Sequence, residues 1–318
     1  YQNKSVPLPP KLFSHNDQQS VWQASNPEGA TSGWGGRIGD LFASSQAGAA
    51  TFTNISVAGN AVFLSGKSTA QYQVTPSGAV PIRALQSPLF GSSACSDALR
   101  ELITAARSQL FEAEHARVVA RSIGASDQLS AALVGLPSLT TAFPADNSLA
   151  AQLAMVAKII AARTQLGVKR QVFLVSLGGF DTHADLLITH PALLTEVGAA
   201  VQAFYQATLE LGVADRVTTF TASDFGRTLT SNGDGSDHGW GSYHFVIGDA
   251  VKGGQFYGAA PEYANNGADD VGQGRLIPTL AVDQLAATLA TWFGVAAGDL
   301  PLVVPNIINF SQSNLGFL

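Results

Sequence analysis

The sequence predicts an α/β fold with a largely parallel sheet flanked by helices, and three observations predict it. Residues 171–177 (QVFLVSL) form a continuous apolar run, which is typical of a strand buried on both faces. Residues 216–222 (RVTTFTA) form a second run rich in apolar and β-branched side chains. A helical pattern over 191–211 separates the two runs, and a crossover of this length joins parallel strands.

The N-terminal half adds a small β region and a helical segment. Residues 1–45 are rich in Pro, Gly, Ser, Asn and Gln, which indicates an irregular segment. Residues 51–85 alternate in places between apolar and polar side chains around Gly59-Asn60, and they predict short strands or a hairpin. Apolar side chains recur at near-helical spacing in four further segments: 97–123, 126–135, 148–167 and 282–293.

The length of 318 residues suits a single α/β domain. Within it we expect three sections. Residues 1–95 hold irregular chain and short strands, residues 96–167 are helical, and residues 168–318 form the α/β part that carries the candidate site.

Composition excludes several classes of protein. The chain has 17 basic and 23 acidic residues, a net charge of −6, so it is too acidic to coat a nucleic-acid backbone. Apolar residues make up 46%, too many for intrinsic disorder, yet no run of eighteen predicts a membrane span. Cys95 is the single cysteine and allows neither an internal disulfide nor a cysteine-based zinc site. Many neutral polar residues favour an exported bacterial protein, periplasmic or secreted.

Dense polar motifs follow both apolar runs, where ligands collect in open parallel sheets. Asp181 and His183 follow the first run, and Asp237 and His238 lie in a glycine-rich loop after the second. Carboxylates and neutral imidazoles form a good ligand set for a divalent metal, so we expect these four residues to bind zinc, calcium or magnesium. The alternative is that each Asp forms a local turn and each His packs nearby.

Other residues complete the candidate site. Arg227 is expected to clamp a tetrahedral anion through bidentate hydrogen bonds. Asp224 is a catalytic candidate, with a structural cap as the alternative. His15 and Asp17, in the N-terminal SHNDQQ cluster, and His244 are additional candidates.

Several common catalytic signatures are absent from the sequence. No G-x-S-x-G motif ends either predicted strand, and no G-x-G-x-x-G or G-K-[ST] loop opens a helix. These absences count against a serine hydrolase, a dinucleotide-binding domain and a P-loop. Paired-carboxylate glycosidase chemistry has no spacing signature and stays open.

A set of ordered motifs resembles the domain of unknown function 1501 family, whose members are mostly twin-arginine-exported bacterial proteins. The match runs nearly from end to end, and its clearest motifs are SHNDQQSVWQ (14–23), SGWGGRIGDL (32–41), GGFDTH (178–183), SDFGRT (223–228) and NGDGSDHGWG (232–241). The family is distantly similar to the alkaline phosphatase and sulfatase superfamily. The resemblance therefore implies an alkaline phosphatase-like fold.

The resemblance also implies a chemistry. Superfamily enzymes bind one or two divalent metals at strand ends and attack a phosphate or sulfate ester with a Ser, Thr or modified Cys nucleophile. Their Asp-His dipeptide ligand corresponds to Asp237-His238. Their earlier Asp and His ligands are usually four residues apart, whereas Asp181 and His183 are two apart, and no His follows His244. The family pattern also includes an upstream strand ending in Gly-Gly-x-Asp-Gly, and this sequence begins after it. We therefore expect either a fragment of a longer protein or a protein that lacks this part of the site.

Three functions follow as hypotheses. The first is an exported, metal-dependent hydrolase of phosphate or sulfate esters, with a small molecule or a glycan ester as substrate. The second is a non-catalytic secreted binding or structural protein with a degenerate site. The third is a metal-independent carbohydrate-active enzyme that uses Asp181 and Asp237. No nucleic-acid partner is expected, and the sequence does not indicate an oligomeric state.

Overall fold

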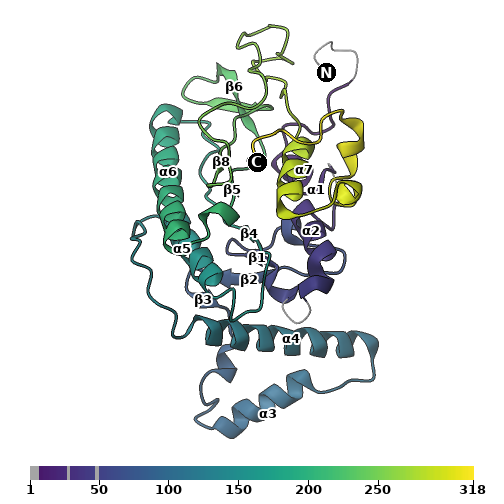
Figure 1. Ribbon diagram of the computed structural model, residues 1–318, viewed down its shortest axis with the longest axis vertical. Helices are drawn as coiled ribbons and strands as arrows, with labels where there is room; N and C mark the ends of the chain where they lie inside the picture. Colours follow the sequence, from purple (N-terminus) through teal and green to yellow (C-terminus); the bar gives the residue numbers. More distant parts are fainter. Residues whose placement is uncertain (1–6, 27–28, 47–49) are drawn as a thin grey trace.

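The computed structural model describes residues 7–26, 29–46 and 50–318. Its mixed α/β fold confirms the predicted class at that level (Figure 1). The helices are α1 (His15–Ala24), α2 (Trp34–Phe42), α3 (Ser93–Thr104), α4 (Leu110–Leu133), α5 (Ser148–Ala161), α6 (Leu186–Glu210), α7 (Val282–Phe293) and α8 (Leu300–Val303). The strands are β1 (Asn54–Ser56), β2 (Tyr72–Thr75), β3 (Gly78–Ala79), β4 (Val172–Leu174), β5 (Thr219–Phe220), β6 (Gly226–Ser231), β7 (Ser236–Gly239) and β8 (Val246–Ile247).

Within the described residues the strands form three small sheets, whereas the sequence predicts one largely parallel sheet. Four strands are ordered β3-β2-β1-β4, with β1 parallel to both β2 and β4 and with β3 antiparallel to β2. The pairs β5–β8 and β6–β7 are antiparallel. The predicted parallel pairing of the two apolar runs is wrong, because β4 pairs with β1 and β5 pairs with β8. A run of apolar residues reports burial of strand faces, and it does not specify which edges pair.

Helices cover the strands on two sides, each over its own hydrophobic core. One core joins α5 and α6 to β1 through residues such as Leu153, Phe204 and Ile55. The other joins α2, α7 and α8 through residues such as Ile38 and Leu289. Figure 1 shows α5 and α6 on one side of the strands and α1, α2 and α7 on the other. The strand ends between these layers carry the candidate site.

The N-terminal segment differs from its prediction, because residues 1–45 include α1 and α2 instead of irregular chain only. Residues 1–6 and 27–28 of that segment lie outside the described residues. The glycines of α2 misled the interpretation, because they serve close packing. A Cβ at Gly36 would overlap the backbone of Ser65 and Gly66. Residues 51–85 do contain short strands, but the antiparallel turn joins β2 to β3 and does not lie at Gly59-Asn60.

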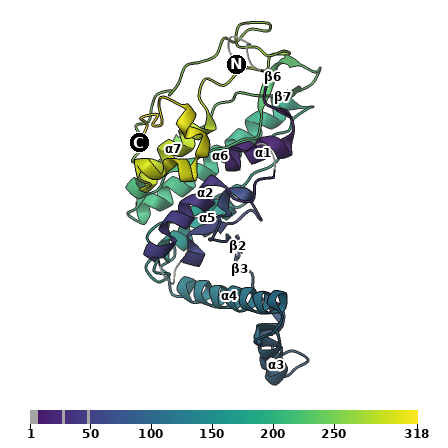
Figure 2. The ribbon, with the colours of Figure 1, turned by 90° about the vertical axis from the view of Figure 1, so that its right-hand side faces the viewer.

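The helical predictions hold best where sequence signals mark both ends. Helix α7 has the predicted bounds and ends at Gly294, which is in the left-handed conformation. Helix α5 starts as predicted, where the side chain of Asn147 accepts the N–H of Ala150 as an N-cap, but it ends at Ala161 and does not reach the predicted bound of 167. The predicted helices 97–123 and 126–135 are divided differently, since the chain breaks between α3 and α4 and α4 then continues to Leu133. Figure 2 shows α3 projecting from the molecule, with α4 between α3 and the strands.

Helix α6 is long and apolar enough to cross a membrane, judged by length and composition alone. An 18-residue window within it has a mean hydropathy of 1.2. The helix also packs against α5 and contributes Ala200, Phe204 and Ala207 to the core. A core helix of a folded domain meets the same criteria, although only 11% of the apolar window of α6 is buried here. The absence of a membrane span therefore stays a prediction.

Candidate metal centre

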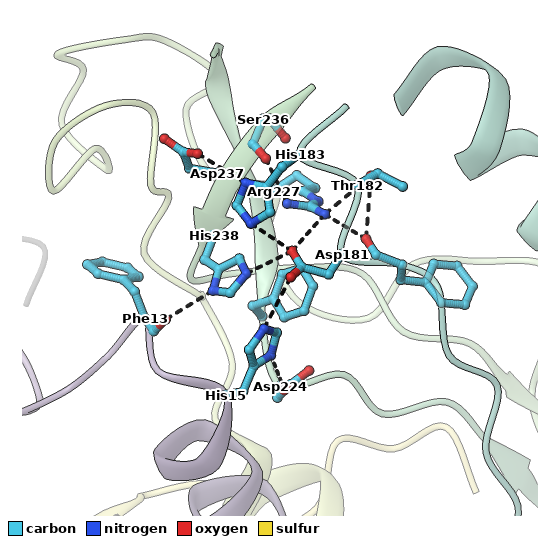
Figure 3. A network of polar contacts seen from close by, with 12 residues as sticks. Phe13, His15, Asp181, Thr182, His183, Asp224, Arg227, Ser236, Asp237 and His238 are labelled. Atoms are coloured by element: carbon cyan, nitrogen blue, oxygen red, sulfur yellow. Dashed lines mark hydrogen bonds and ion pairs between the residues drawn. The ribbon is translucent and has the colours of Figure 1, made fainter. Parts of the chain in front are cut away.

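Side chains from four separate parts of the chain meet at one edge of the fold (Figure 3). His15 is the first residue of α1, and Asp181 follows β4. Asp224 follows β5, and His238 lies on β7. The predicted convergence of the two strand-end motifs is therefore observed, although the two strands do not pair with each other.

Glycine at position 235 allows this convergence. A Cβ there would overlap the backbone of Thr182 and His183, so the β6–β7 turn can lie directly on the 182–183 segment. Hydrogen bonds hold the contact, because Asn232 Nδ2 donates to the carbonyl oxygen of His183 at 3.1 Å and Asp185 N donates to the carboxylate of Asp234 at 3.1 Å. The turn thereby places the β7 side chains beside Asp181.

Asp181 is the centre of the cluster, since three imidazole rings point at its carboxylate (Figure 3). Its Oδ1 lies 2.9 Å from Nε2 of His238 and 3.0 Å from Nε2 of His183. Its Oδ2 lies 3.3 Å from Nε2 of His15. One ligand atom from each of His15, Asp181 and His238 can be chosen so that all three lie within 4.8 Å of one another.

The other ring nitrogen of each histidine faces an acceptor. Nδ1 of His15 lies 2.8 Å from Asp224 Oδ2, and Nδ1 of His183 lies 3.3 Å from Asp237 Oδ1. Nδ1 of His238 lies 3.0 Å from the carbonyl oxygen of Phe13. Metal-binding histidines usually donate their second N–H to such a group, which fixes the tautomer and orients the ring.

The hydrogen bond from His238 to Phe13 carries a specific consequence. A carbonyl oxygen only accepts, so Nδ1 of His238 holds a proton. In the neutral ring, Nε2 then presents its lone pair to a carboxylate oxygen of Asp181 at 2.9 Å, which is repulsive. Either a proton on Nε2 or a cation shared by the two atoms removes this repulsion. The donor set therefore fits a bound metal ion.

The electrostatics of the cluster keep Asp181 ionised. Partial burial raises its pKa, but the hydrogen bond and charge of His238, the charge of His183 and the hydrogen bond of His15 outweigh burial and lower the pKa below its usual value. The pKa of His15 is raised, mainly by its hydrogen bond to Asp224 and against the opposing effect of burial. A metal needs the ionised carboxylate together with neutral imidazoles, so a bound ion must displace the proton that the raised pKa favours on His15.

Arg227 lies inside the cluster, with its guanidinium bound to protein atoms. Its Nη1 donates to the carbonyl oxygen of Ser236 at 2.7 Å, and its Nη2 donates to that of Phe180 at 2.7 Å. Nη2 also lies 3.2 Å from both Asp181 Oδ1 and Thr182 Oγ1. Arg227 thus ties β6 and β7 to the chain after β4. An anion clamp at this residue would have to replace these bonds.

The chain matches the family model "Protein of unknown function (DUF1501)" over residues 1–297. It belongs to the DUF1501 family. No curated protein and no solved structure matches it. The alkaline phosphatase-like relationship and the twin-arginine export that the resemblance implies stay predictions.

The structure of this DUF1501 protein places the predicted site residues in three groups. His15, Asp181 and His238 surround one point, with His183 against Asp181, and Asp224 and Asp237 lie behind two of the histidines. Asp17 lies apart from these contacts, with Lys11 at 3.9 Å. His244 contacts Ser242 and Thr221 instead of the cluster.

Two groups in the cluster of this DUF1501 protein are more prominent in the structure than in the sequence: the side chain of His15 and the carbonyl oxygen of Phe13. His15 is only an additional candidate in the sequence, yet it contacts both Asp181 and Asp224. The SHNDQQ cluster gives a signal for it, but nothing in the sequence indicates which strand end it meets. The carbonyl oxygen of Phe13 has no side-chain signature, so only the folded chain reveals it.

Proposed function

We propose that this DUF1501 protein is a metal-dependent hydrolase of phosphate or sulfate esters. The observation that carries the proposal is the convergence of imidazole Nε2 atoms on the carboxylate of Asp181, with an acceptor behind each ring. His15, Asp181 and His238 would hold the ion, and His183 lies against the same carboxylate. A bound divalent ion supplies Lewis-acid polarisation and neutralises charge that develops on the ester.

The donor set favours zinc among the three ions considered. Imidazole nitrogen suits zinc, whereas calcium and magnesium prefer sites built from oxygen atoms. Two imidazoles with one carboxylate match the composition of catalytic zinc sites, which keep a fourth position open. We therefore propose zinc as the ion, with calcium and magnesium as the comparison ions in the tests.

The residues around the ion have separate tasks in this proposal. Asp224, Asp237 and the carbonyl oxygen of Phe13 orient the histidine rings. Arg227 holds Asp181 and keeps a positive charge beside it. The side chains of Asp181 and His183 are 41% and 49% exposed, so a small-molecule or glycan ester can reach the cluster from solvent.

Export to the periplasm or the medium belongs to the same proposal, and it rests on composition and on the family resemblance. The substrate class also rests on the resemblance. The net charge of −6 argues against nucleic acid as the ester. The oligomeric state does not enter the argument.

The test begins with metal analysis of protein purified without chelator, followed by hydrolysis of 4-nitrophenyl phosphate and 4-nitrophenyl sulfate. We expect stoichiometric zinc, and turnover that is lost in EDTA and restored by zinc more than by calcium or magnesium. His238→Ala should lose both metal and turnover, while His115→Ala, at an exposed position on α4, should keep both. Absence of stoichiometric metal, together with turnover unchanged in His238→Ala, would refute the proposal.

A second candidate is a non-catalytic secreted binding or structural protein. The half-exposed state of the cluster favours it, because catalytic sites usually enclose their substrate. Stoichiometric metal without turnover on either ester would support this candidate. The third hypothesis needs a protonated acid at Asp181 or Asp237, and the lowered pKa of Asp181 is unsuited to that role.

A further inference from the structure

A second histidine site lies apart from the metal cluster. Oγ of Ser242 lies 2.9 Å from Nε2 of His244, and Oγ1 of Thr221 lies 3.4 Å from Nδ1 of the same ring. A nucleophile within hydrogen-bond reach of a base, with a third group that orients the base, is the arrangement that activates serine. None of these three residues contacts Asp181.

The hydrogen bonds indicate which nitrogen of His244 holds the proton. Thr221 Oγ1 already accepts the backbone N–H of Phe245 at 2.9 Å, and a hydroxyl oxygen has a second lone pair. Thr221 can therefore accept Nδ1–H of His244 as well. Nε2 is then free to accept the hydroxyl proton of Ser242, as a general base must.

The surroundings of the pair suit this division of roles. The ring of Trp22 meets the ring of His244 edge to face at a centroid distance of 4.6 Å. Burial lowers the pKa of His244 to about 4, so its ring is neutral at physiological pH. Ser242 is exposed, which leaves its hydroxyl open to a substrate.

We propose that Ser242 and His244 form a second, metal-independent nucleophilic site that accepts acyl groups from esters. Ser242 Oγ attacks the carbonyl carbon while Nε2 of His244 takes the hydroxyl proton. The C–O bond to the alcohol breaks, and the alcohol leaves with the proton from Nε2. Water then releases the acid from Ser242 by the same steps. A base with so low a pKa activates serine modestly, so we expect slow turnover.

Motif analysis does not find this pair, because its segment reads GWGSYH and lacks G-x-S-x-G. The pair instead depends on a spacing of two residues. The inference is independent of the proposed metal function, since it uses none of the cluster residues.

The test uses diisopropyl fluorophosphate on the full chain in EDTA, followed by intact mass and peptide mapping. Labelling forms a bond from Ser242 Oγ to phosphorus, breaks the P–F bond, releases fluoride and passes the hydroxyl proton to His244. We expect one adduct, on Ser242, that is absent in Ser242→Ala and unchanged in Ser122→Ala, a control at another exposed serine. The same reagent should label His115→Ala, a control at an exposed histidine on α4, at the wild-type rate.

Variants of His244, the proposed base, and of Thr221, which orients it, show whether Ser242 reacts because its hydroxyl is activated or only because it is exposed. His244→Asn should label about 10²-fold more slowly, as loss of a general base predicts. Thr221→Val should also slow labelling, whereas Thr221→Ser should restore it, so the test survives if His244→Asn misfolds. The wild-type rate should hold down to about pH 5 and fall only as pH approaches 4. No adduct on Ser242, or equal rates in wild type, His244→Asn and Thr221→Val, would overturn the proposal.

Discussion

The substitution Asp224→Asn is the sharpest test of the metal centre. Asp224 contacts His15 on the side of the ring that faces away from Asp181, so it is an outer partner of a proposed metal ligand. Asp224 Oδ2 lies 2.8 Å from Nδ1 of His15, and the side chain is only 16% exposed. The substitution keeps the shape of the side chain and an oxygen acceptor, but it removes the charge that makes His15 a stronger ligand. Loss of such an outer partner typically weakens metal binding by about 10- to 100-fold, or about 1.4 to 2.7 kcal/mol.

The same loss of affinity predicts a change in the free energy of unfolding measured in the presence of zinc. With free zinc at 100 times the wild-type Kd, binding stabilises the folded protein by about 2.7 kcal/mol. A Kd raised 10- to 100-fold at the same zinc concentration reduces this to between about 1.4 and 0.4 kcal/mol. Competition against a zinc-binding dye measures the Kd, and denaturant unfolding with and without zinc measures the stabilisation.

Two controls make this experiment decisive. Asp215→Asn removes a carboxylate that is 71% exposed and lies 3.4 Å from its neighbour Arg216, so zinc affinity should not change. Metal-free Asp224→Asn should unfold near the wild-type midpoint, which separates metal binding from folding. If Asp224→Asn binds zinc within twofold of wild type, the assignment of Asp224 as the outer partner of a metal ligand is wrong.

Three further predictions concern the fold. Asn147→Ala removes the N-cap of α5 and the hydrogen bond from Nδ2 to the carbonyl oxygen of Glu196, so it should lower the free energy of unfolding in urea titrations by about 0.5–2 kcal/mol for the cap and by more for the unpaired carbonyl. Asn147→Asp keeps the cap acceptor but sets a carboxylate oxygen against that carbonyl, so it should recover only part of the loss. Gly36→Ala places a Cβ against the backbone of Ser65 and should lower the free energy of unfolding by about 1–3 kcal/mol or more; an unchanged midpoint would contradict the packing described. Hydrogen bonds from the 140–141 backbone and the Thr141 hydroxyl lower the pKa of Glu210 to about 2, so this carboxylate stabilises the fold above about pH 4.5 and less as pH falls towards 2. Glu210→Gln should therefore be less stable than wild type at pH 7, with a difference that shrinks on acidification and is followed by circular dichroism.

Local signals in the sequence predict the helices better than the strands. Helix α7 is marked by its amphipathic pattern and by Gly294, and its predicted and observed bounds agree. Strand β4 is only three residues long and pairs with β1, more than a hundred residues earlier in the chain. Apolar pattern carries no information about such a partner. For the same reason the predicted parallel pairing of β4 and β5 fails.

The candidate site divides in a similar way. The strand-end motifs give Asp181, His183, Asp237 and His238 as candidates because their residue types suit a metal. The side chains of β7 lie beside Asp181 because Gly235 allows its turn to pack on the backbone of residues 182–183. In the sequence Gly235 is only one glycine among 32. The contact of His15 with Asp224 joins residues 209 positions apart, and no periodicity reports it.

The connection between the projecting helix α3 and helix α4 is a suitable site for inserting a label into this protein. Helix α3 buries none of its twelve residues. The buried residues that α4 contributes to the core of α5, α6 and β1 all lie in the second half of α4: Ala125, Leu129 and Ala132. The turn at 105–109 is therefore a favourable place to insert a peptide tag or a fluorescent domain, since exposed turns with few contacts accept insertions. A label at that point would report on the protein in a cell extract while leaving the strand ends around Asp181 untouched.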